Sequence, residues 1–74
     1  MQPIGDGTYD GVVVEAFRDD DGVVHVDIAV SAGPHKGDVL PVLMRGRDGD
    51  PVLLLGLPAR VVVTDGRPRV TIDV

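Results

Sequence analysis

The chain has 74 residues, a formal net charge of -5 at pH 7 and no cysteine. A chain of this length buries only roughly 60% of its unfolded surface and has room for one core, so we expect a single domain over residues 1–74. The charge opposes long-range attraction to a phosphate backbone. No apolar run approaches the ~20 residues that cross a bilayer, so we expect a cytoplasmic protein without membrane association.

The composition predicts an all-β fold, because 43% of the residues are hydrophobic and fifteen are valine, which fits a pleated and half-buried surface. Residues 8–18 are rich in β-formers and are expected to form a long, bent first strand. Gly11 lies near its start, where a missing side chain allows a bulge or a sharp coil. An acidic turn, residues 19–22, ends this strand.

The second strand has the clearest pattern. Val24, Val26, Ile28 and Val30 alternate with His25, Asp27, Ala29 and Ser31, which predicts one buried face and one exposed face. It stops at residues 33–37, where a proline and two glycines favour a reversal. A third strand is expected over residues 38–45. Pro41 lies inside it and cannot donate to a neighbour, which predicts a sheet edge or a break in pairing.

Residues 50–56 carry helix punctuation at both ends. Asp50 is a suitable N-cap, Pro51 fits the first helical position and Gly56 fits the C-terminal cap. The pattern predicts a short helix of one to two turns. A short buried strand over residues 52–55 remains an alternative, because periodicity does not separate the two at this length.

The remaining residues predict a β-hairpin. Two strands, 59–64 and 69–74, flank the turn dipeptide Asp65-Gly66. In the last strand Val70, Ile72 and Val74 are expected to face the core. The full order is β-β-β-α-β-β, with the helix between strands three and four, which is the order of the five-stranded OB barrel. An SH3-like barrel is the alternative.

Three short motifs occur in the first part of the chain: the opening Gly7-Thr8-Tyr9, the Asp-Gly first turn and the second turn at residues 33–37. They carry a resemblance to the small OB-type single-stranded DNA-binding proteins of phages and mobile elements. It implies a small β-barrel that binds single-stranded nucleic acid across the second and third strands, between the flanking loops.

This resemblance suggests a nucleic-acid-binding surface made of a stacking ring and a basic rim. The candidate residues are Phe17, His25, Lys36, Arg45, Arg47, Arg67 and Arg69. Tyr9, the other aromatic residue, is expected to fill the interior. For Phe17 the strand phase is ambiguous, because a bulge at Gly11 would change it.

The second hypothesis is an acidic subunit that binds another protein or assembles with copies of itself through an open strand edge near Pro41 or Val74. We expect no enzyme, because the chain has one serine and no phosphate-cradling or nucleophile motif. No cofactor is expected. His25 and Asp27 could share a metal ion but are interpreted as a surface pair, and the acidic turn lacks the ligand spacing of a calcium loop.

Overall fold

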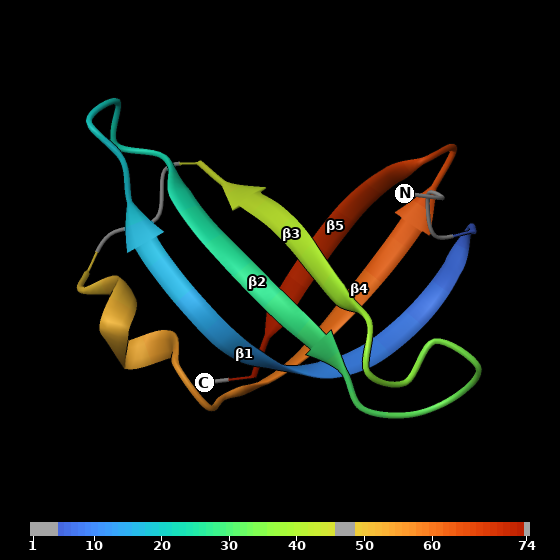
Figure 1. The fold of residues 1–74 in the computed structure, drawn as a ribbon. Coiled ribbons are helices and arrows are strands. Elements are labelled where there is room, and N and C mark those ends of the chain that lie inside the picture. The colour runs from blue at the N-terminus through green and yellow to red at the C-terminus, as the bar shows by residue number, and fades with distance from the viewer. Residues whose placement is uncertain (1–4, 46–48, 74) are drawn as a thin grey trace.

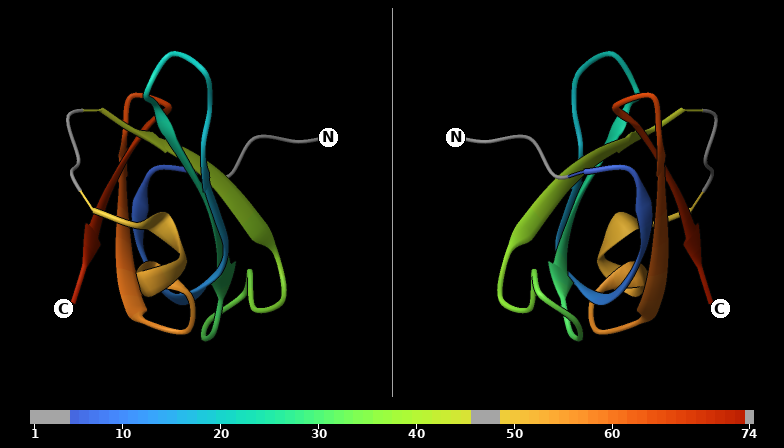
Figure 2. Two further views of the ribbon diagram at one scale, coloured as in Figure 1. Left: turned by 90° about the vertical axis from the view of Figure 1, so that its left-hand side faces the viewer. Right: turned by 90° about the vertical axis from the view of Figure 1, so that its right-hand side faces the viewer.

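The computed structural model describes residues 5–45 and 49–73. It contains five strands, β1 (Gly7–Arg18), β2 (Val24–Val30), β3 (Val39–Met44), β4 (Pro58–Thr64) and β5 (Arg67–Ile72), and one 3-10 turn, η1 (Pro51–Leu54). The all-β prediction is confirmed. All pairings are antiparallel, in the order β3-β2-β1-β4-β5, and the sheet curls into a half-barrel (Figures 1 and 2). In the described part of the chain no helix is long and apolar enough to cross a membrane.

The core lies inside the curl and follows the predicted alternation of β2. Val24, Val26, Ile28 and Val30 are all buried, and the first three pack with buried residues from β1, β3, η1, β4 and β5. The buried set is entirely apolar. Folding therefore depends on removing aliphatic side chains from water, which branched residues on pleated strands do well.

β1 is the central strand and pairs on both sides. Gly11 stands opposite Val30 on β2 and opposite Ala59 on β4, so the two pairings of β1 overlap there. A Cβ atom on Gly11 would overlap the carbonyl oxygen of Ala29 and lie 2.7 Å from Cγ2 of Ile28. Glycine is therefore needed at this position for close approach of the backbones.

The bulge that the sequence suggested at Gly11 lies further along β1. The register shifts between Val13 and Glu15, so Val14 is the extra residue. A bulge changes which face the following side chains occupy. As a result Phe17 points to the outer face and is 50% exposed, which resolves its ambiguous phase.

The short helix expected between the third and fourth strands is not formed, and that prediction is wrong in its helix type. Asp50 does cap the segment, since its carboxylate accepts from the Val52 N–H. The bonds are of the i→i+3 kind, however, as in Leu55 N–H to Val52 O. The next donor, the Gly56 N–H, bonds Val13 O on β1 at 2.8 Å and is unavailable to extend an α-helix. The resulting turn covers one end of the half-barrel beside the second half of β1 (Figure 2).

The predicted hairpin is confirmed. Asp65 and Gly66 both have positive φ, 53° and 75°, as a two-residue type I′ turn requires. The turn is held from outside the hairpin, because the Asp6 carboxylate accepts from the backbone N–H groups of Asp65 and Gly66 at 2.9 and 3.1 Å. Ile72 is buried as predicted, whereas Val74 lies outside the described residues.

The two edge strands, β3 and β5, approach each other on the open side of the half-barrel. Along an antiparallel edge strand, backbone N–H groups point alternately toward the neighbouring strand and toward the open edge. The bond from Val30 N–H to Asp38 O shows which residues of β3 face β2, and the bond from Asp73 N–H to Pro58 O shows which residues of β5 face β4. In that alternation Pro41 and Pro68 both stand at positions whose N–H would point to the open edge. Each edge thus lacks one donor, and the predicted edge position of Pro41 is confirmed.

Substitution of Gly11 tests the close approach at the centre of β1. Gly11→Ala is expected to lower the free energy of unfolding by about 2 kcal/mol or more, because the new methyl group meets backbone atoms that cannot rotate away. Gly5→Ala is the matched control, since its nearest atom would be the Tyr9 hydroxyl at 3.9 Å. Urea denaturation followed by circular dichroism measures both. Equal midpoints for the two variants would contradict the close approach.

Candidate functional site

The outer face of β1, β2 and β3 holds three rows of side chains that lie across the strands. The first row is Phe17, His25 and Leu43, since His25 stands opposite both of the others. The rings of Phe17 and His25 stack with centroids 4.6 Å apart and an angle of 2° between their planes. Phe17 and Leu43 are 50% and 55% exposed, so this row presents apolar surface to solvent.

The position of His25 is fixed by the turn before it. Asp19 Oδ1 accepts from the backbone N–H groups of Asp21 and Val23 at 2.9 and 3.0 Å, and the other oxygen lies 2.7 Å from His25 Nε2. These three interactions lower the pKa of Asp19 below its usual value, with the His25 hydrogen bond the largest cause. The acidic turn therefore holds the imidazole against Phe17.

The second row places two carboxylates side by side. Glu15 stands directly opposite Asp27, and Pro41 follows on β3. Neither carboxylate has an ion-pair partner among the residues that the structure describes. Like charges directly opposite each other on neighbouring strands destabilise a sheet. This face thus keeps a negative pair that no cation among residues 5–45 and 49–73 compensates.

The third row is apolar again. Val12, Ala29 and Val39 lie across the three strands, and Val12 and Val39 are 36% and 50% exposed. Two apolar rows therefore flank the carboxylate pair. We call the surface formed by these three rows the docking face.

The structure brings together only part of the predicted nucleic-acid site. Phe17 and His25 are in contact. Lys36 lies in the β2–β3 loop, past the far end of β2, roughly 17 Å or more along the strand from His25. Arg45 follows β3 and is exposed, and Arg47 lies outside the described residues.

The remaining two candidates, Arg67 and Arg69, lie on β5, at the opposite end of the strand order from β3. Both are exposed, and neither has an ion-pair partner within residues 5–45 and 49–73. Arg69 stands opposite Val62, whose side chain is 40% exposed. The outer face of the β4–β5 hairpin is therefore basic and partly apolar. Tyr9, expected inside, is half-buried against the core, with its hydroxyl donating to Gly5 O.

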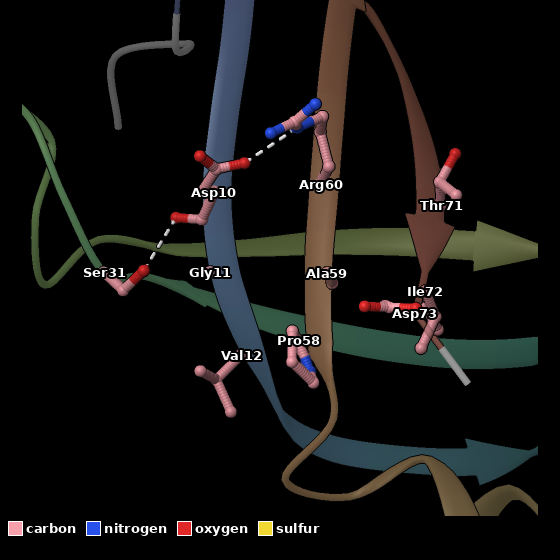
Figure 3. A pocket seen from close by; sticks show the side chains of 10 residues that line it. All are labelled: Asp10, Gly11, Val12, Ser31, Pro58, Ala59, Arg60, Thr71, Ile72 and Asp73. Carbon is pink, nitrogen blue, oxygen red and sulfur yellow. Dashed lines mark hydrogen bonds and ion pairs between the residues drawn. The ribbon is translucent and has the colours of Figure 1, made fainter.

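An open groove of about 780 Å³ lies on the outer surface where β1, β4 and β5 meet (Figure 3). Arg60 Nε donates to Asp10 Oδ1 at 2.9 Å, which raises the pKa of Arg60, and Ser31 Oγ donates to Asp10 O at 3.2 Å. No local sequence pattern marks this groove, because Asp10 and Arg60 meet only through the β1–β4 pairing. Of the three charged side chains that line it, Asp10 and Arg60 already satisfy each other, and Asp73 is exposed.

No group of three or more acidic or histidine side chains that could hold a metal ion occurs in the part of the chain that the structure describes. His25 bonds Asp19 and not Asp27, as its position beside the turn requires. In comparisons with protein-family models, curated proteins and solved structures, no match to this chain was found.

The lowered pKa of Asp19 predicts a pH dependence of stability. A carboxyl group with a depressed pKa stabilises the fold above its unfolded value, 3.8, and this contribution is lost as the pH falls through the lower folded value. Asp19→Asn should therefore have a lower melting temperature than the parent near neutral pH, and the gap should narrow as the pH falls below 3.8 and through the lower folded value. Thermal denaturation followed by circular dichroism across this pH range measures it. Asp20→Asn is the control, and a gap that stayed constant with pH would contradict the assignment.

The unpaired carboxylates predict a stabilising substitution. Glu15→Gln removes the repulsion with Asp27 and keeps the shape of the side chain, so it should raise the free energy of unfolding by about 0.2–1 kcal/mol. Asp21→Asn, in the exposed turn, is the control for general loss of one negative charge. Urea titrations measure both. A Glu15→Gln variant less stable than the parent would show that Glu15 has a favourable partner.

Proposed function

We propose that this chain is a non-enzymatic binding domain of the OB type that docks a protein partner on its outer β1–β2–β3 surface. Three features support the OB assignment: β1 pairs with both β2 and β4, β3 and β5 approach each other, and the segment between β3 and β4 covers one end. In OB domains the corresponding strand face is the binding surface.

The observation that carries the proposal is the pattern of the docking face. Two exposed apolar rows flank the pair Glu15 and Asp27, and no cation within residues 5–45 and 49–73 balances that pair. Exposed apolar side chains gathered on one face are typical of protein interaction sites. The uncompensated charge favours a partner that brings a basic side chain between the apolar rows.

Single-stranded nucleic acid is the second candidate, and the exposed Phe17–His25 stack favours it. A base stacked on Phe17 would, however, bring its phosphate close to Glu15, Asp19 and Asp27, all on or beside the same face. Of the described basic candidates, Arg45 follows β3 near Leu43, whereas Lys36, Arg67 and Arg69 lie on other parts of the molecule. Charge and geometry together favour the protein partner.

Chemical-shift titration of isotope-labelled protein tests the proposal. The probes are synthetic peptides of alternating valine and lysine, valine and serine, or valine and glutamate, together with a thymidine oligomer. The lysine peptide is expected to shift amides of the docking face selectively, with an affinity about tenfold above that of the glutamate peptide.

Phe17→Ser/Leu43→Ser should abolish the shifts. Val52→Ser/Leu53→Ser removes two exposed aliphatic residues of η1 that belong to none of the three rows, and should not. Salt-dependent binding of the thymidine oligomer without binding of any peptide would replace the protein-docking proposal with the nucleic-acid one. Equal binding of all three peptides would overturn the role of charge.

A further inference from the structure

The chain carries its own surface of complementary chemistry. On the outer face of the β4–β5 hairpin, Arg67 and Arg69 are two residues apart on one strand, so both point outward and lie about 7 Å apart along it. Val62 stands opposite Arg69 and adds exposed apolar area. Like the carboxylate pair, these two guanidinium groups repel each other and have no ion-pair partner among the described residues.

The two surfaces cannot meet within one molecule. The docking face belongs to β1, β2 and β3, whereas Arg67 and Arg69 lie on the opposite edge strand, β5, and on the outside of the curl. Both sets of side chains lie at positions that alternate with the buried residues of their strands, so both point away from the core. Mutual neutralisation therefore requires two molecules.

We propose that the partner docked on this face is the β4–β5 hairpin of a second copy of the chain, with Arg67 and Arg69 placed against Glu15 and Asp27 and Val62 against the apolar rows. This inference rests on the proposed function and identifies the protein partner that binds the docking face. Contact relieves two like-charge repulsions at once and removes exposed apolar side chains from water. The free sheet edges are poor alternatives for self-association, because Pro41 and Pro68 remove a donor from each.

The net charge of -5 opposes association at long range, so the contact requires short-range complementarity. At about 0.15 M salt the Debye length is about 8 Å, which screens the overall repulsion more than the contacts at the interface. Self-association is therefore expected to be detectable at physiological ionic strength. If the docking face of each copy contacts the hairpin of the other, the assembly closes as a dimer. If each copy contacts two different neighbours, it forms a ring or an open chain.

Sedimentation equilibrium of two charge-reversed variants tests the inference. Arg67→Glu/Arg69→Glu makes the hairpin acidic, and Glu15→Lys/Asp27→Lys makes the docking face basic. Each variant alone is expected to associate at least about tenfold more weakly than the parent, because its two surfaces now repel. An equimolar mixture is expected to recover association, since the acidic hairpin of one fits the basic face of the other and the unchanged surfaces still match.

Control variants carry charge changes of the same sign outside both surfaces. Lys36→Glu is the control for the first variant, Asp20→Lys/Asp21→Lys is the control for the second, and all three positions are exposed. The controls should associate as the parent does, and their mixture should show no special recovery. Circular dichroism establishes that each variant is folded, and the neutral pairs Arg67→Gln/Arg69→Gln and Glu15→Gln/Asp27→Asn replace any that is not.

Three outcomes separate the two proposals. Weak association of each variant with recovery in the mixture supports the inference. A parent protein that stays monomeric at high concentration, yet binds the valine–lysine peptide on the docking face, overturns the inference and keeps the protein-docking function. Self-association that no charge reversal alters overturns the charge pairing proposed for the contact.

Discussion

The close approach of β1 to β2 at Gly11 is the constraint on which the architecture depends. Because no side chain separates the backbones there, β1 can pair with β2 and with β4 over overlapping residues. This double pairing curls one continuous sheet around the aliphatic core. The outer faces of its two halves then point in different directions, so one chain can present an acidic surface and a basic surface without their meeting.

The docking face keeps features that a sheet selected for stability alone would lack. Glu15 opposes Asp27 with no ion-pair partner in the described part of the chain, and Phe17 and Leu43 remain about half exposed. Repulsion and exposed apolar area both cost stability in the isolated molecule. The same features become favourable when a partner of opposite charge and apolar character covers them, which is a common compromise at functional surfaces.

Local patterns were sufficient to predict most strands. The alternation of β2 and the Asp65-Gly66 turn each determine structure over a few residues, and both predictions are confirmed. The helix type failed because the Gly56 N–H bonds Val13, a residue far away in the sequence. The outward position of Phe17 depends on a bulge at Val14, where no glycine marks it. The Glu15–Asp27 pair depends on the same β1–β2 register, so the sequence alone could not predict it.

The central place of β1 also determines how the chain can assemble as it folds. The β1–β2–β3 meander and the β4–β5 hairpin each form from neighbouring residues, whereas Gly7 must find Val63 across most of the chain. Pairing across such a separation closes a long loop, and the chain loses conformational entropy before the favourable contacts form. Folding is therefore slower than it would be if all strands paired with their neighbours in the sequence. The Asp6 carboxylate binds the hairpin turn only once the two units have met. The two hydrogen bonds of Asp6 are therefore expected to lower the unfolding rate more than they raise the folding rate.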